Sequence, residues 1–146
     1  MKKEQTYFDV IVVGTGISGL YTALSLDEKL NVLIISKGKV DNCNTIRAEG
    51  GMAASVGKED SPLLHAKDTI AAGGELNDTQ VVNIFTNEVL ERIRELENMG
   101  FKFDRDESGN YILGLEGFHS VRRILHYDED KIGKGIFKFL FSLIQQ

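Results

Sequence analysis

The chain has 146 residues with 42% hydrophobic and 27% charged side chains and one proline, which predicts one globular domain and excludes general disorder or a fibrous repeat. Its net charge of −5 argues against a nucleic-acid-binding surface, and no apolar run approaches the roughly 20 residues that cross a bilayer. The single cysteine, Cys43, excludes an internal disulfide, and residues 1–10 lack the apolar stretch of a secretory signal. These features predict a cytoplasmic protein without a nucleic-acid or membrane partner.

The first third of the chain predicts a parallel β-α-β unit. Residues 8–13 are a continuous β-branched run, which predicts a strand buried on both faces. A glycine-rich turn follows at once, then a helical stretch with an apolar face over 20–26 and a second buried strand over 31–36. Because so short a connection favours the right-handed parallel crossover, the predicted fold class is α/β.

A long loop and two helices are predicted next. Residues 37–58 lack periodicity and are punctuated by glycines, and loops of this length are typical of functional segments. Ser61 and Pro62 predict the start of a helix that runs to about Ala72. Asp78 predicts the cap of a longer helix.

The longer helix is expected to turn one apolar stripe toward the core and to end at Gly100, a left-handed C-cap. The stripe consists of Val82, Phe85, Val89, Ile93 and Leu96. Residues 101–113 predict a small hairpin about a polar turn at 106–110, and residues 132–143 predict a final helix.

Three glycines follow the first strand with the spacing Gly14-x-Gly16-x-x-Gly19, and in this context the weak motif indicates dinucleotide binding. Gly14 permits the tight turn, Gly16 lets a pyrophosphate reach the backbone, and Gly19 lets the helix pack on the strand. The helix N-terminus offers free N–H groups to the phosphates. The residues of this predicted Rossmann-like site are Gly14, Thr15, Gly16, Ile17, Ser18 and Gly19. The alternative is a plain strand-turn-helix corner.

The acidic residue that usually ends the second strand of such a fold and bonds the ribose hydroxyls is absent. Ser36 and Lys37 stand there, and Asp41 lies too far along the chain to replace it. Either hydroxyl and backbone groups hold the ribose, or the dinucleotide interpretation is wrong.

A second motif places a small hydroxyl residue, Thr45, five positions before the glycine pair Gly50 and Gly51. Such a loop lets backbone amides lie against a flat ring, with Thr45 free to bond a phosphate or a ring oxygen. The segment resembles the flavin loop of the succinate dehydrogenase, fumarate reductase and L-aspartate oxidase superfamily, with Glu49 where glutamine is usual. The cofactor residues that the resemblance implies are Asn44, Thr45, Ile46, Arg47, Ala48, Glu49, Gly50 and Gly51, with Ser36 and Lys37. The alternative is a solvated glycine loop.

The residue before Thr45 distinguishes members of this superfamily. Succinate dehydrogenases and quinol-linked fumarate reductases have a histidine there that bonds covalently to the flavin, whereas this chain has Asn44. The resemblance therefore implies FAD held without a covalent bond. Ser36-Lys37-Gly38 also looks like the L-aspartate oxidases rather than their acid-bearing relatives.

A third motif, residues 116–126, gathers a carboxylate, two imidazoles and two guanidiniums. Such a cluster suits a small dianionic substrate, whose carboxylates arginine forks can clamp, although a surface strand with salt bridges would have the same composition. The segment resembles the part of L-aspartate oxidases that lines the flavin and substrate region. The resemblance implies that Glu116 receives the substrate ammonium group and makes His119 and Arg122 candidate catalytic residues. Phe118 stands where the family commonly has glycine.

The remaining candidate residues give weaker indications of function. His65 is predicted to be a surface histidine, and Cys43, which has no base near it in the sequence, is predicted to be unused. No His, Cys and carboxylate spacing indicates a metal site.

The resemblance runs from about Phe8 to Gln146 and implies that residues 1–146 are the amino-terminal portion of an FAD-binding domain. The capping domain, the carboxy-terminal helical domain and the arginine thought to act as acid–base in the family lie outside this chain. We therefore expect apolar sheet surface to be exposed and the chain alone to be inactive.

The reaction that the resemblance implies is oxidation of L-aspartate to iminoaspartate with FAD as hydride acceptor, reoxidised by oxygen or fumarate. The product feeds quinolinate synthase in NAD biosynthesis. Two alternatives remain: a fumarate- or succinate-handling flavoprotein, and a non-catalytic dinucleotide-binding module.

Overall fold

The computed structural model describes residues 7–145, so most of the amino-terminal segment in which no secretory signal was predicted lies outside the described residues. The chain divides into two compact units. The first unit comprises residues up to Ala48 together with Gly133 onward, and the second comprises Glu49–Ile132.

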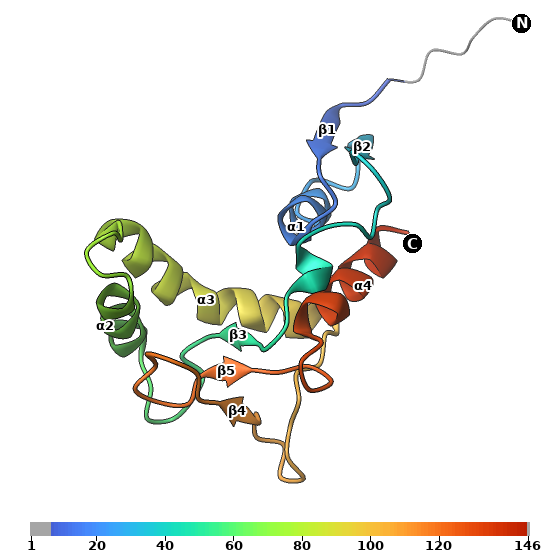
Figure 1. Cartoon of the computed structure of the whole chain (residues 1–146). Helices are drawn as coiled ribbons and strands as arrows, with labels where there is room; N and C mark the ends of the chain where they lie inside the picture. The colour runs from blue at the N-terminus through green and yellow to red at the C-terminus, as the bar shows by residue number, and fades with distance from the viewer. Residues whose placement is uncertain (1–6, 146) are drawn as a thin grey trace, which may run out of the picture. The chain divides into compact units, whose positions relative to one another are not determined.

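The first unit contains the predicted parallel β-α-β arrangement (Figure 1). Strand β1 (Val10–Val13) pairs in parallel with β2 (Val32–Ile35), and helix α1 (Ile17–Leu24) connects them. The unit also holds the short 3-10 helix η1 (Thr45–Arg47) and almost all of helix α4 (Ile132–Ile144). The α/β prediction and the final helix are confirmed.

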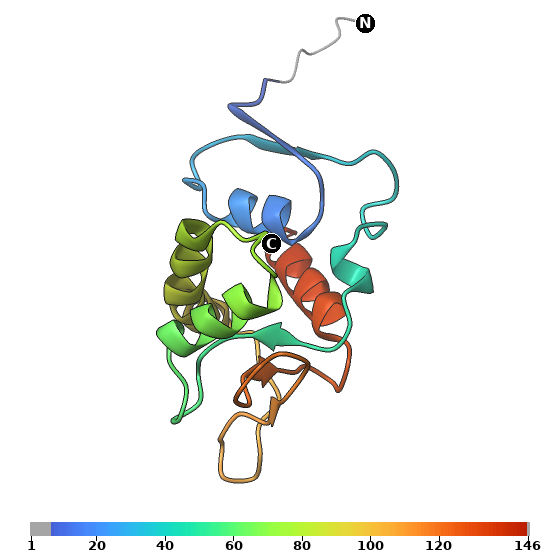
Figure 2. The ribbon, with the colours of Figure 1, turned by 60° about the vertical axis from the view of Figure 1, so that its left-hand side comes forward.

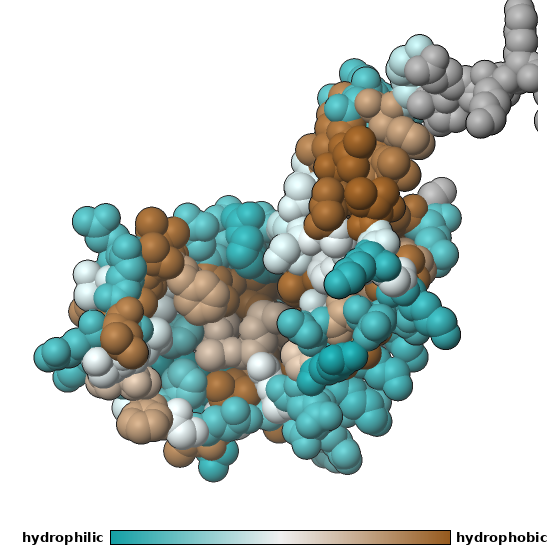
Figure 3. All heavy atoms as spheres, turned by 45° about the horizontal axis from the view of Figure 1, so that its top comes forward, coloured by the Kyte–Doolittle hydropathy of each residue, from teal (hydrophilic) through white to brown (hydrophobic). Residues whose placement is uncertain are grey.

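The prediction that these strands are buried on both faces is wrong. Helix α1 packs against both strands. Because side chains alternate along a strand, Val12 is buried while Ile11 and Val13 point the other way and are 58% and 79% exposed. Figure 3 shows hydrophobic atoms gathered over these strands. The expected exposure of apolar sheet surface is confirmed.

The second unit contains two helices whose ends follow the predicted capping residues. Helix α2 (Pro62–Ala72) starts at Ser61, whose hydroxyl accepts from the N–H of Leu64, and helix α3 (Thr79–Met99) starts at Asp78. Gly100 ends α3 with a φ of 111°, a conformation that glycine adopts without strain. The two helices pack against each other, as Figure 2 also shows.

The apolar stripe of α3 is predicted correctly except at Phe85. Val82, Val89, Ile93 and Leu96 are buried, but Phe85 is 54% exposed and Thr86 is buried in its place. Spacings of four and three residues from Val82 place Thr86 on the line of the other four, and Phe85 lies to one side of it. The Thr86 hydroxyl donates to the carbonyl of Asn83, which makes its burial tolerable.

A three-stranded antiparallel sheet completes the second unit, with β5 (Ile124–Leu125) between β3 (Met52–Ala53) and β4 (Leu113–Gly114). The predicted polar turn is present: the N–H of Asp106 donates to the carbonyl of Asn110 at 2.9 Å. The hairpin is short, with one bridge between Arg105 and Tyr111, because the chain after it pairs with β5. Within residues 7–145, no helix is long and apolar enough to span a membrane, and no cluster of three metal-ligating side chains occurs.

Candidate functional site

The glycine turn of the first unit has the geometry that the motif predicts. Gly14 has a φ of 113° and donates its N–H to the carbonyl of Ile35 at 2.8 Å. A Cβ added to Gly19 would overlap the carbonyl oxygen of Gly14. Gly14 therefore makes the tight turn, and Gly19 allows α1 to pack closely on it.

The glycine turn and the flavin-like loop meet at Thr45. The N–H of Ile17 donates to the Thr45 hydroxyl oxygen at 2.9 Å, and a Cβ on Gly16 would lie 3.3 Å from that oxygen. The Thr45 oxygen accepts this bond, and its hydroxyl hydrogen can still donate to a phosphate or ring oxygen. Within the described chain, the N–H groups of Ser18 and Gly19 have no acceptor, so the N-terminus of α1 keeps two donors for an anion.

The predicted ribose-side residues lie at the end of β2. Ser36 and Lys37 are exposed, and the hydroxyls of Ser36 and Thr15 are 3.5 Å apart. Thr15 is buried and donates its hydroxyl to the carbonyl of Val40 at 2.8 Å. Thr15 thus holds the start of the following loop, and Ser36 and Lys37 remain available to a ligand.

Sequence reasoning missed Gly133, which lies in the first turn of α4. Its N–H donates to the carbonyl of Ala48 at 3.2 Å, and a Cβ there would overlap the carbonyl oxygen of Thr45. Gly133 thus lets α4 pack directly on the backbone of η1. A glycine in the first turn of the predicted helix was the signal that could have identified it.

The other predicted residues of this loop differ in exposure. Asn44 and Arg47 are exposed, and Arg47 donates to the side-chain oxygen of Asn42 at 2.8 Å. Ile46 is half-buried.

In the second unit, Gly50 of the glycine pair lies beside Glu116. Gly50 has a φ of 79°, and a Cβ on it would lie 3.4 Å from a carboxylate oxygen of Glu116. The carbonyl of Gly50 is 2.7 Å from Nδ1 of His126. The structure therefore brings together Gly50 and Glu116, which the second and third motifs proposed separately. Glu49 is exposed.

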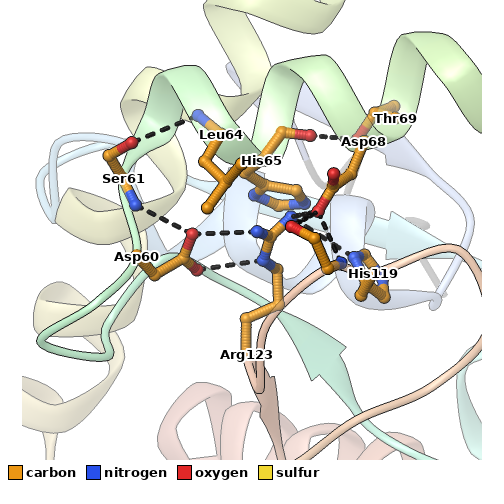
Figure 4. Close-up of polar contacts among 9 residues, drawn as sticks. Asp60, Ser61, Leu64, His65, Asp68, Thr69, His119 and Arg123 are labelled. Carbon is orange, nitrogen blue, oxygen red and sulfur yellow. Dashed lines mark hydrogen bonds and ion pairs between the residues drawn. The ribbon is translucent and has the colours of Figure 1, made fainter.

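The two adjacent arginines of the third motif have different environments. Arg123 has a fully buried side chain and forms a two-pronged ion pair with Asp60, with contacts of 2.9 and 2.8 Å (Figure 4). Its third nitrogen lies 3.0 Å from Asp68. The side chain of Arg123 is thus used entirely within the protein interior. Arg122 is exposed and donates to the carbonyl of Leu113 at 3.3 Å, so of the two arginines only Arg122 can reach a ligand.

Asp60 and Asp68 are the second set that sequence reasoning missed. The N–H and hydroxyl of Ser120 both donate to one oxygen of Asp68 at 2.8 Å. Desolvation alone would raise the pKa of Asp68, but these bonds and the charge of Arg123 outweigh it and lower the pKa. The carboxylates therefore tie the loop before β5 to helix α2.

His119 and Phe118 lie in that loop. Nδ1 of His119 is 3.3 Å from a nitrogen of Arg123. Because a guanidinium nitrogen can only donate a hydrogen bond, Nδ1 of His119 is the acceptor. Phe118 has a φ of 64°, a left-handed backbone conformation that glycine adopts more readily than other residues. The left-handed backbone costs about 1–2 kcal/mol for a residue with a Cβ.

The prediction that His65 lies on the surface is wrong. The residue is 2% exposed, and within the described residues its Nδ1 has no hydrogen-bond partner. Its ring meets those of Phe85 and His119 edge-on, with centroids 6.1 and 5.8 Å away. Burial, and then the charges of Arg123 and His119, lower the pKa of His65, so the imidazole is held neutral.

We expect the free energy of unfolding to fall as the pH drops below about 6.5, partly because of His65. Since its pKa in the folded chain is lower than the ordinary 6.5, the unfolded chain binds a proton first. The stability from neutral His65 is complete above that pH and decreases below it, by at most about 1.4 kcal/mol per pH unit. Urea unfolding at pH values of about 7.5 and 5.5 measures this. His65→Gln should show a weaker pH dependence, and an unchanged slope would contradict the expectation.

Comparisons with known proteins identify the family of this chain. The family described as FAD binding domain matches residues 9–146. The L-aspartate oxidase of Clostridium acetobutylicum is 40% identical over 138 residues, which are 94% of this chain and 31% of that protein. The chain thus spans about a third of the length of this relative.

Two solved structures share the fold. Mycobacterium smegmatis Sdh1 in complex with UQ1 is 33% identical, with a TM-score of 0.85 over 97% of this chain and 25% of that one. A quinol-fumarate reductase with menaquinol molecules is 29% identical, with a TM-score of 0.84 over 95% of this chain and 25% of that one. The chain therefore belongs to the FAD binding domain family, with FAD as its cofactor and with relatives among the L-aspartate oxidases and the succinate dehydrogenase and fumarate reductase flavoproteins.

Proposed function

We propose that this chain is the amino-terminal, flavin-binding part of an enzyme that oxidises L-aspartate to iminoaspartate. The observation that carries the proposal is the Glu116 carboxylate against Gly50, since it puts a negative charge beside the loop that resembles a flavin site. A substrate with an ammonium group gains from that charge, whereas succinate has no such group. The 40% identity to a protein named L-aspartate oxidase supports the same substrate.

The residues of the first unit fit FAD. The unbonded N–H groups of Ser18 and Gly19 are donors for a pyrophosphate, and Gly16 has no side chain in front of them. Ser36 and Lys37 are the proposed ribose contacts in place of an acid. Asn44 has no imidazole for a covalent link, so we propose that FAD is held by non-covalent contacts alone.

FAD, when bound, supplies the hydride acceptor. Glu116 would bind the substrate ammonium group, and the exposed Arg122 would pair with a substrate carboxylate. His119 accepts from Arg123 through Nδ1, which leaves its Nε2 hydrogen to donate to the substrate. These roles need the substrate held in place and water excluded.

Under this proposal, the activity of the whole enzyme requires parts that this chain does not contain. The capping domain, the helical domain and the acid–base arginine would come from outside residues 1–146, so the chain alone should not turn over L-aspartate. Reoxidation by oxygen or fumarate, a link to quinolinate synthase in NAD biosynthesis and the cytoplasmic location stay predictions.

The second candidate is a fumarate- or succinate-handling flavoprotein, which the fold similarity to Sdh1 and to a quinol-fumarate reductase favours. Glu116 and Asn44 argue for L-aspartate instead. The remaining alternative is a non-catalytic dinucleotide-binding module, which would bind its ligand at the glycine turn and would have no use for Glu116.

We expect the FAD-loaded protein to bind L-aspartate more tightly than succinate, and Glu116→Gln to remove this preference. Because the variant loses a hydrogen bond to a charged group, its affinity for L-aspartate should fall roughly ten- to a hundredfold. The change in flavin absorbance on titration with each ligand measures both affinities. Glu107→Gln, which removes an exposed carboxylate in the polar turn, is the matched control. Equal affinities for the two ligands in the unmodified protein would contradict the proposal.

A further inference from the structure

The imidazole of His126 lies in a slot formed by two glycines of the second unit. Nδ1 of His126 is 2.7 Å from the carbonyl oxygen of Gly50. A Cβ on Gly114, in strand β4, would overlap Nε2, and a Cβ on Gly51 would lie 3.4 Å from Nδ1. The absence of a side chain at Gly114 makes room for this ring, whereas a side chain on Gly51 would overlap Ile124 and the carbonyl oxygen of Leu125.

The bond to Gly50 defines the protonation of the ring. A carbonyl oxygen can only accept a hydrogen bond, so Nδ1 of His126 carries the hydrogen and donates it. The bond joins residues 76 positions apart and therefore holds the flavin-like loop against the end of β5.

The same bond orients the next N–H group. In a trans peptide the N–H points opposite to the preceding carbonyl, and no cis peptide occurs in the part of the chain that the structure describes. Because the Gly50 carbonyl points at His126, the Gly51 N–H points away from the ring. Among residues 7–145 this N–H has no acceptor. A donor is thus presented beside Gly50, where the Glu116 carboxylate also lies.

We propose that His126 is a positioning residue for FAD, which acts by fixing the Gly50–Gly51 peptide so that the Gly51 N–H donates to the flavin ring. The inference rests on the proposed function, because that function assigns the ring to this loop. His126 itself does not touch the ring and acts through the peptide.

The test compares two variants of similar shape. His126→Asn keeps an N–H donor near the position of Nδ1, and His126→Leu removes it without adding bulk. We expect His126→Leu to weaken FAD binding about tenfold and to shift the visible absorption of bound flavin, and His126→Asn to stay within about threefold of the unmodified protein. Fluorescence titration with FAD and absorbance spectra are the readouts, with thermal unfolding as the control for folding.

Each outcome is decisive. If the unmodified protein binds no FAD, the proposed function is wrong and this inference fails with it. If it binds FAD and His126→Leu binds equally well with the same spectrum, the inference alone is wrong. Should His126→Leu fail to fold, ¹⁵N NMR of the unmodified protein decides, because an unprotonated Nδ1 would overturn the hydrogen bond on which the inference depends.

Discussion

Replacing Arg123 by methionine is expected to lower the free energy of unfolding by about 3–5 kcal/mol. The guanidinium is fully buried and forms ion pairs with two carboxylates, Asp60 and Asp68. Removing one member of a buried ion-pair cluster leaves the other charges without compensation, which costs more than the pair itself contributes. The loss is large beside the total stability of about 5–15 kcal/mol that is typical of a folded protein.

Arg122→Met is the matched control for this experiment. The neighbouring arginine is exposed, so its replacement should change the free energy of unfolding by no more than about 0.5 kcal/mol. Urea unfolding followed by circular dichroism measures both variants. Similar losses in the two would show that the buried cluster does not stabilise the fold.

Gly16→Val is expected to abolish FAD binding at concentrations that saturate the unmodified protein. Gly16 precedes α1 with φ of −69° and ψ of 176°, an extended conformation that valine adopts without strain. Its Cβ would lie 3.3 Å from the Thr45 hydroxyl, a tight contact that the Thr45 side chain relieves by moving a few tenths of an ångström. The side chain would, however, occupy the space in front of the helix N-terminus through which a pyrophosphate reaches the backbone.

Ala72→Val is the control for that loss. Ala72 is exposed at the end of α2, away from the residues proposed to hold FAD, so a valine there should leave FAD binding unchanged. Isothermal titration with FAD measures both variants, and circular dichroism confirms that each is folded. Unchanged affinity in a folded Gly16→Val protein would mean that the glycine turn is only a structural corner.

The glycine turn, the helix ends and the parallel unit could be predicted because they depend on neighbours along the chain. The side chains of Ser61 and Asp78 accept hydrogen bonds from the first turn of the helix beside them. The left-handed backbone of Gly100 ends α3. A strand, a tight glycine turn and a helix within about 30 residues leave few other topologies. The candidate site residues of these segments could therefore be proposed from residue type and spacing.

Tertiary structure alone decided the roles of Arg122 and Arg123, which are identical in type and adjacent in sequence. The carboxylates that select Arg123 lie on and just before α2, and Asp60 is 63 positions away from it. Tertiary structure also decided the burial of His65, because its neighbour His119 comes from a loop that is distant in the sequence. Composition and periodicity describe which groups are present and which face of an element is apolar. Which partner a buried charge finds depends on contacts between segments that lie far apart in the chain.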